Sequence, residues 1–479
     1  MRVSVFVGLC LSGCVSSNPI EAVDLSSPER VLFDRTRTVK IETTSPYITY
    51  ALANVGDING DGDDEFAFNL QGTITVYEDR GSGPVVMTTR SGFRQGSAVA
   101  GVDLHGDGYS DLIISRPYAD HGSLVWYRGG ASGLATTSHS VTGSADDYFG
   151  SVLAAAGDTN RDGYEDLVVG SGGGGAYLYY GSASGLRSSW YSILSTTGGR
   201  YVAGVGDPDG NLSQNVAVDT DGYGRVYTGA AVLNTYGYGD KDIDYRLSGG
   251  GDINGDGLDD VVVASANTSG GGLGGGSGST LDLFAGSSAG AATRLNHVTG
   301  APLAVAGLYR PVIVPDMNGD GFDEVAVGHP NYDLNQGAVY LIPGGAEGFD
   351  LEELETEYGL DGSQISVQFG ADLIAGDFDG DGAGDFVVGA PGAKYLTIYY
   401  GSTPAPIPEP PNVLIQEIFP NPDGTDSGQE WIELYNAGSQ SVNLGAYRIQ
   451  AGTSSYGLKC CLDPPPAPRR PRAAPERHE

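Results

Sequence analysis

Seven acidic segments of nine residues carry the side chains of this sequence that are best suited to chemistry. Each follows the pattern D-x-N-G-D-G-x-x-D or a variant of it. Side-chain oxygens at positions 1, 3, 5 and 9, with the backbone carbonyl of position 7, suit a hard divalent cation that takes about six to eight oxygen ligands. The pattern therefore predicts calcium-binding loops. The segments, numbered loops 1 to 7 in chain order, are Asp57–Glu65, Asp103–Asp111, Asp158–Asp166, Asp207–Asn215, Asp252–Asp260, Asp316–Glu324 and Asp377–Asp385.

Five of the loops carry acids at positions 1, 5 and 9 and Asn or Asp at position 3. Turn formation favours Asp, Asn and Gly, but it does not require carboxylates at these spacings. We therefore expect five calcium sites. Their predicted ligands, with position 7 contributing its carbonyl, are Asp57, Asn59, Asp61, Asp63 and Glu65; Asp158, Asn160, Asp162, Tyr164 and Asp166; Asp252, Asn254, Asp256, Leu258 and Asp260; Asp316, Asn318, Asp320, Phe322 and Glu324; and Asp377, Asp379, Asp381, Ala383 and Asp385.

Loops 2 and 4 depart from the pattern. In loop 2 the ligands would be Asp103, Asp107, Tyr109 and Asp111, but His105 at position 3 offers nitrogen, a poor ligand for calcium. Two interpretations of loop 2 therefore stand: a sixth calcium site, or a loop that binds no calcium. In loop 4, Leu212 replaces the glycine of position 6, Ser213 stands at position 7 and Asn215 replaces the acid of position 9. No tight site is expected in loop 4.

The residues after each loop show what positions these ligands. An EF-hand would need a bidentate Glu at position 12, but that position holds strand-type residues such as Phe68, Ile114 and Val169. An apolar run follows every loop, and further apolar residues precede several of them, so each loop is expected to connect two antiparallel strands. The runs are Phe66–Phe68, Leu112–Ile114, Leu167–Val169, Val216–Val218, Val261–Val263, Val325–Val327 and Phe386–Val388. Their spacing predicts an all-β chain with one small sheet per repeat, as in the blades of a β-propeller.

Short motifs around the loops resemble FG-GAP repeats, the units of the integrin alpha-chain propeller and of many bacterial surface proteins. Phe149-Gly150 and Phe369-Gly370 precede their loops, and Gly389-Ala390-Pro391 follows loop 7. The resemblance covers roughly residues 45–402 and implies a seven-bladed propeller, with the domain spanning 31–402. It also implies that Val31–Ile41 supplies the outer strand of the last blade.

Composition excludes some classes of partner. With 25 basic and 60 acidic residues, the formal net charge is -35, which repels nucleic acid and anionic lipid headgroups. The cysteines are Cys10, Cys14, Cys460 and Cys461, so no disulfide can link the repeats. A large core and bound metal must stabilise them instead.

The start of the chain predicts export. A short apolar run follows Met1-Arg2 and is too brief to cross a bilayer, so residues 1–14 are expected to be a signal peptide and 15–30 a flexible tether. Leu11-Ser12-Gly13-Cys14 resembles the bacterial lipobox, which implies lipidation of Cys14 and a place at the bacterial outer membrane or cell surface. An ordinary signal peptide and secretion are the alternative.

The C-terminal part predicts a second, smaller unit. Residues 403–411 are proline-rich and predict a stiff linker. The string IQEI at 415–418 and the string EWIELYN at 430–436 resemble the start of a lamin-tail-type domain, an immunoglobulin-like β-sandwich. This implies a partial sandwich over 412–458. Residues 459–479 become rich in proline and arginine, which indicates a disordered tail or a frameshifted or truncated reading frame.

Three functions are compatible with these features. The first is a non-catalytic, calcium-stabilised adhesion or binding module at a cell surface, with an unidentified protein or glycan partner. The second is a carbohydrate-active or hydrolytic enzyme, although no nucleophile elbow, zinc signature or P-loop is present and the histidines are scattered. The third is a purely structural envelope scaffold. Fold alone does not decide between them.

Overall fold

The computed structural model divides the chain into two compact units, Arg30–Thr403 and a unit made of Met1–Glu29 with Pro404–Glu479. The described residues are 38–43, 52–79, 83–119, 121–143, 148–172, 175–187, 190–192, 198–220, 223–228, 231–236, 243–267, 280–288, 293–299, 311–352, 354–358, 367–401, 413–419, 431–436, 442–443, 448–451, 454–457 and 461–462. The signal peptide with Cys14, the tether, the linker 403–411 and residues 463–479 lie outside them.

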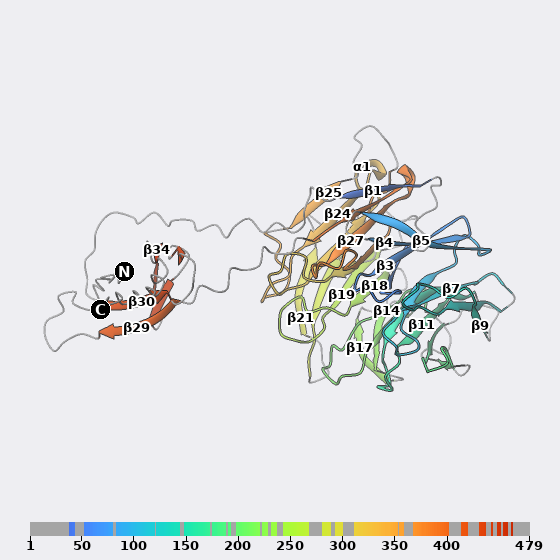
Figure 1. The fold of residues 1–479 in the computed structure, drawn as a ribbon, viewed down its shortest axis with the longest axis horizontal. Helices are drawn as coiled ribbons and strands as arrows, with labels where there is room; N and C mark the ends of the chain where they lie inside the picture. The colour runs from blue at the N-terminus through green and yellow to red at the C-terminus, as the bar shows by residue number, and fades with distance from the viewer. Residues whose placement is uncertain are drawn as a thin grey trace, which may run out of the picture. The chain divides into compact units, whose positions relative to one another are not determined.

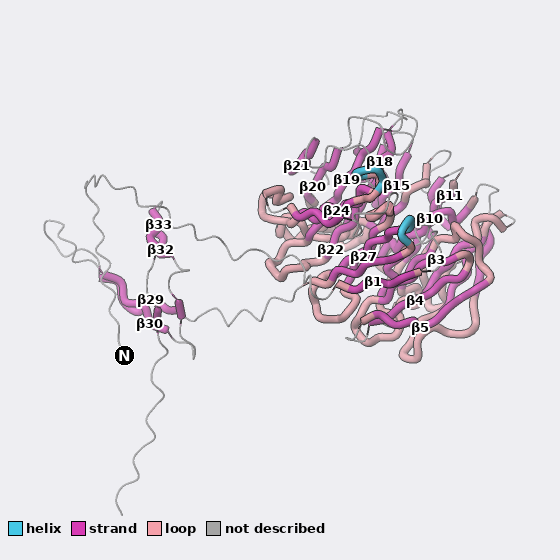
Figure 2. The backbone as a smooth tube through the Cα atoms, turned by 90° about the horizontal axis from the view of Figure 1, so that it is seen from above, coloured by secondary structure: helices cyan, strands magenta, loops and turns pink. Residues whose placement is uncertain are grey.

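The Arg30–Thr403 unit consists of seven antiparallel sheets of four strands each, which confirms the predicted seven-bladed propeller (Figures 1 and 2). From the first strand of each sheet to the last, the first six blades are β2 (Ala53–Gly56), β3 (Glu65–Leu70), β4 (Thr73–Asp79) and β5 (Pro84–Ser91); β6 (Val99–Val102), β7 (Asp111–Ser115), β8 (Ser123–Tyr127) and β9 (His139–Thr142); β10 (Phe149–Gly157), β11 (Asp166–Ser171), β12 (Gly175–Tyr179) and β13 (Trp190–Ser192); β14 (Val202–Gly204), β15 (Val216–Thr220), β16 (Tyr223–Thr228) and β17 (Ala231–Tyr236); β18 (Ile243–Gly249), β19 (Val261–Asn267), β20 (Thr280–Ala285) and β21 (Thr293–Thr299); and β22 (Pro311–Val314), β23 (Glu324–His329), β24 (Ala338–Ile342) and β25 (Glu355–Tyr358).

The seventh blade joins the two ends of the propeller. It contains β26 (Leu373–Gly376), β27 (Asp385–Ala390) and β28 (Tyr395–Tyr399), and its outer strand is β1 (Val39–Glu42). Val39 pairs with Ile398 in antiparallel register, and Figure 1 shows this blue strand beside the orange strands of the last blade. β1 overlaps the segment that the sequence assigned to this position, and residues 31–37 lie outside the described part. The pairing covers an edge of β28 that would otherwise be open to association.

The second strand of each blade carries the apolar run that follows its loop. In β7, β11, β23 and β27 every residue is buried, because neighbouring blades cover both faces of the strand. The outer strands were not identified individually from sequence. β5, for example, alternates irregularly between half-buried and exposed residues, and this leaves a weak pattern.

The core lies between the blades. The described residues form seven buried apolar clusters, one at each junction between neighbouring blades. At the junction of blades 7 and 1, the ring of Phe66 packs edge-on against that of Phe378, with centroids 5.5 Å apart. The first strands of several blades line a cavity of about 230 Å³ on the propeller axis. Each blade is therefore held mainly by its neighbours.

Helical structure is minimal in the described residues. α1 spans Tyr332–Asn335 and a single 3-10 turn spans Pro391–Ala393. No helix in the described part of the chain is both long and apolar enough to cross a membrane.

The C-terminal unit contains three antiparallel strand pairs. β29 (Val413–Phe419) pairs with β30 (Trp431–Asn436), β31 (Val442–Asn443) with β34 (Cys461–Leu462), and β32 (Arg448–Ala451) with β33 (Ser454–Gly457). β34 lies inside the segment expected to be a disordered tail.

Candidate metal centres

Each acidic loop joins the first strand of a blade to the second, and neighbouring loops are bonded to one another. The backbone N–H of position 8 donates to the carbonyl oxygen of position 1 in the preceding blade. The described pairs are Ser110 to Asp57 (2.8 Å), Glu165 to Asp103 (3.1 Å), Gln214 to Asp158 (3.2 Å), Asp323 to Asp252 (3.2 Å), Gly384 to Asp316 (3.3 Å) and Asp64 to Asp377 (2.7 Å). The loops therefore follow one another around one end of the propeller.

Backbone hydrogen bonds set the side chains of positions 1 and 5 in the same way in every loop. The side chain of position 1 accepts the N–H of position 6 at 2.6 to 3.0 Å. The side-chain oxygen of position 5 accepts the N–H of position 7 at 2.8 to 3.3 Å. These bonds turn oxygens from both positions toward the inside of the loop, where a cation would lie.

Position 9 supplies a buried carboxylate. Glu65, Asp166, Asp260, Glu324 and Asp385 are all 0% exposed. Each accepts the N–H of position 2 at 2.7 to 3.0 Å. Burial raises the pKa of Glu65 and Asp385 to about 8, of Glu324 to about 9, of Asp260 to about 7 and of Asp166 to about 6. A bound cation would favour the ionised form and oppose these shifts.

Loop 7 shows most directly that the residues fit calcium. Carboxylate oxygens of Asp377, Asp379 and Asp385 lie within 4.8 Å of one another. Oδ1 of Asp377 is buried and has no hydrogen-bond partner in the described part of the chain. Three carboxylates this close repel one another unless a proton or a cation lies between them. The donors are all oxygen, as calcium prefers.

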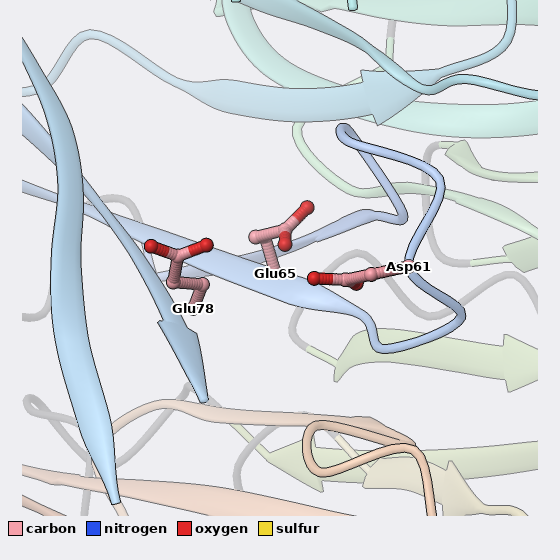
Figure 3. Close-up of side chains that lie close together, drawn as sticks. All are labelled: Asp61, Glu65 and Glu78. Carbon is pink, nitrogen blue, oxygen red and sulfur yellow. The ribbon is translucent and has the colours of Figure 1, made fainter. Parts of the chain in front are cut away.

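Loop 1 also gathers a carboxylate from outside the nine-residue pattern. Figure 3 shows Glu78 of β4 beside Asp61 and Glu65, and carboxylate oxygens of the three lie within 4.8 Å of one another. Glu78 is 5% exposed. It belongs to the third strand of the blade, outside the nine-residue pattern, so only the pairing of Tyr77 with Phe66 places it next to the loop.

Loops 1, 5 and 6 also bring the amide of position 3 to the acid of position 9. Nδ2 of Asn59 donates to Glu65 at 2.8 Å, Nδ2 of Asn254 to Asp260 at 3.0 Å and Nδ2 of Asn318 to Glu324 at 3.0 Å. Oδ1 of Asn59 and Asn318 accepts the N–H of position 5. In these three loops the side chains of positions 3 and 9 thus lie together, and in loops 1 and 6 the N–H of position 5 holds the amide oxygen of position 3.

Loops 2 and 3 differ because basic side chains contact their carboxylates. In loop 2, Nη2 of Arg128 lies 2.5 Å from Asp107 at position 5. Nδ1 of His105 lies 2.5 Å from Asp111 at position 9. In loop 3, Nη2 of Arg187 lies 2.6 Å from Asp162 at position 5. The predicted ligands are present, but these carboxylates already have nitrogen partners.

Loop 4 keeps the turn with fewer acids: Asp207 and Asp209 remain, whereas Asn211 and Asn215 stand at positions 5 and 9. Leu212 adopts φ of 69° at the position held by glycine elsewhere, and its side chain is 79% exposed. Nδ2 of Asn211 donates to Asp209 at 2.6 Å, so an amide occupies the place of the position-5 acid.

The glycine of position 4 has a packing role that was not recognised from sequence. A Cβ at any of three of these glycines would collide with the loop of the next blade, at its position 7 or position 6. The contacts would be Gly60 with Tyr109 at 2.5 Å, Gly106 with Gly163 at 2.4 Å and Gly255 with Phe322 at 2.7 Å. In loop 3 position 4 is Arg161, and position 7 of the next blade is the small Ser213. At the junction of blades 7 and 1, Gly380 is position 4 and Asp63 is position 7 of the next blade. Burial and the nearby Asp61 raise the pKa of Asp63 to about 6.

Comparisons with known protein families agree with this architecture. The profile described as FG-GAP-like repeat matches residues 103–169, and the FG-GAP repeat profile matches 309–342 and 369–403. The Lamin Tail Domain profile matches residues 406–459. The chain thus carries FG-GAP repeats and a segment similar to a lamin tail domain.

Similar curated proteins are integrin alpha chains. Integrin alpha-V of Gallus gallus is 28% identical over 230 residues, which cover 42% of this chain and 22% of the relative. Integrin alpha-6 of Gallus gallus is 35% identical over 141 residues, which cover 26% of this chain and 13% of the relative. The alignments thus span less than a quarter of these relatives. A solved structure, "Crystal structure of BBS1N in complex with ARL6DN, soaked with mercury", aligns over 77% of this chain and 99% of its own with 10% identity and a TM-score of 0.49.

Proposed function

We propose that this chain is a calcium-stabilised, non-catalytic binding or adhesion protein. The observation that supports it best is the close approach of carboxylate oxygens in loops 1 and 7, within 4.8 Å of one another, in a propeller whose sequence relatives are integrin alpha chains. Calcium would supply positive charge among carboxylates that lie at the junctions between blades. The residues of this chain would hold it through positions 1, 3, 5 and 9 and the carbonyl of position 7.

The partner is proposed to be a surface protein or a glycan that contacts the end of the propeller away from the acidic loops. Tyr118 follows β7 and Tyr148 precedes β10, so both lie at strand ends opposite loops 2 and 3. Their side chains are 49% and 56% exposed, and their rings meet edge-on with centroids 5.9 Å apart. Exposed aromatic faces of this kind suit sugar rings and apolar side chains.

A glycan array and a pull-down from surface extracts, both with calcium-saturated protein, test this role. We expect saturable binding that the double variant Tyr118→Ala, Tyr148→Ala weakens at least about tenfold. Val232→Ala, which alters an exposed residue of blade 4, is the matched control. Absence of any partner together with turnover of polysaccharides or esters would favour the enzyme instead.

The protein is also proposed to reach the cell surface as a lipoprotein, through the lipobox-like Cys14. Labelled fatty acid should appear in the wild-type protein and not in Cys14→Ala. Equal labelling of both proteins would contradict this anchor.

A further inference from the structure

Arginine side chains reach the acidic loops of two neighbouring blades. Arg128 directly follows β8, the third strand of blade 2, and both its Nε and its Nη2 donate to Oδ2 of Asp107, at 3.2 and 2.5 Å. Arg187 follows β12 in blade 3, and its Nη2 donates to Oδ2 of Asp162 at 2.6 Å. Both acids stand at position 5, whose other oxygen is held by the N–H of position 7. The guanidinium therefore bonds to Oδ2, the carboxylate oxygen that a calcium ion would need.

The same place in blade 1 carries the opposite charge. Tyr77 and Tyr127 pair with the residues that directly follow position 9, so the next residues, Glu78 and Arg128, are equivalent. Glu78 adds a carboxylate to loop 1, whereas Arg128 adds a cation to loop 2. The structure thus shows that a side chain at this place reaches the ligands of its own loop.

Loop 5 provides a reference without such a cation. Asp252, Asp256 and Asp260 form no ion pair with a basic side chain in the described part of the chain. Loops 3 and 5 have the same acids at positions 1, 5 and 9 and the same Asn at position 3. Arg187 is therefore a clear difference between two loops that are otherwise equivalent as ligand sets.

We infer that Arg128 and Arg187 replace calcium in loops 2 and 3, so that these two loops hold their shape without a metal ion. This inference rests on the proposed calcium role of the other loops. A guanidinium bonded to the position-5 acid neutralises it and repels a divalent cation from the same place. In loop 2, His105 also contacts Asp111, the position-9 acid. Two substitutions are therefore needed to release both carboxylates of that loop for calcium.

Calorimetric titration of the full-length protein with calcium chloride tests the inference by counting sites. Arg187→Gln should bind about one more calcium ion per chain than wild type, and the pair His105→Asn with Arg128→Gln should do the same. Arg187→Lys keeps the charge and should leave the count unchanged. Arg225→Gln, which removes an arginine packed on the ring of Tyr223, is the control for lost charge. Equal counts for Arg187→Gln and wild type would overturn the inference.

Two further measurements separate this inference from the calcium role on which it rests. Asp256→Asn should lose about one calcium ion, and an unchanged count in that variant would overturn the calcium role itself. In chelator, Arg187→Gln should unfold at a lower temperature than wild type and should regain the difference when calcium is added. If calcium restores nothing in Arg187→Gln, the arginine does not stand in for a cation.

Discussion

The backbone N–H of Asp64 donates a 2.7 Å hydrogen bond to the carbonyl oxygen of Asp377 and so joins the first and last acidic loops. The carboxylate of Asp64 accepts Nδ2 of Asn54 at 2.8 Å. That nitrogen also donates to the carbonyl of Ala375 on β26 at 2.9 Å. Position 8 of the loop therefore links neighbouring blades.

Asp64→Ala should lower the free energy of unfolding by about 1–3 kcal/mol, because the partly buried Asn54 amide loses its charged acceptor and keeps only the carbonyl of Ala375. Urea unfolding in saturating calcium measures the change. Ser110→Ala, which alters position 8 of loop 2 without removing a carboxylate, should stay within about 0.5 kcal/mol of wild type. Equal losses in both variants would argue against a special role of Asp64.

Removal of residues 1–43 should open the seventh blade. The deletion takes away β1 and exposes the pairing edge of β28. Such an edge favours association with other chains. We expect a lower thermal midpoint and concentration-dependent aggregation by light scattering, whereas removal of residues 1–29, which lie outside the propeller unit, should change neither. A monomeric shorter protein with an unchanged midpoint would show that β1 does not close the ring.

Leu212→Gly should stabilise the protein by about 0.5–1 kcal/mol. Leu212 has φ of 69°, a left-handed conformation that costs a residue with a Cβ about 1–2 kcal/mol, partly offset by the greater unfolded-state entropy of glycine. The leucine side chain is 79% exposed, so little packing is lost. Urea unfolding should show the gain, and a loss of stability would mean that the side chain makes contacts that outweigh its backbone strain.

Without metal, stability should fall as the pH rises. Burial raises the pKa of Glu65 and Asp385 to about 8 and of Glu324 to about 9, so the folded protein binds protons that the unfolded chain has released. The folded state is therefore favoured at low pH and loses this advantage between about pH 4 and pH 9. Thermal midpoints in metal-free buffer should decrease from about pH 5 to about pH 8, and calcium should remove most of the decrease. A metal-free midpoint that rises over this range would contradict the burial of these acids.

The sequence predicted the parts of the site that are local in the chain. Asp377, Asp379 and Asp385 fall within nine residues, and the alternation of loop and apolar run predicts the hairpin that holds them. Glu78 and Arg187 could not be found in this way. They reach their loops from a later strand or the segment after it, and their positions depend on strand register and on the path of the chain after β12. Position 8 was missed because its partners belong to the neighbouring blade.

The thermal midpoint of the wild-type protein, measured with saturating calcium and again after complete chelation, tests the calcium role most directly. If calcium holds the carboxylates of the loops together, chelation should lower the midpoint by at least about 5 °C, and readdition of calcium should restore it. An unchanged midpoint after chelation would contradict the account, because the clustered acids would then be stable without a cation.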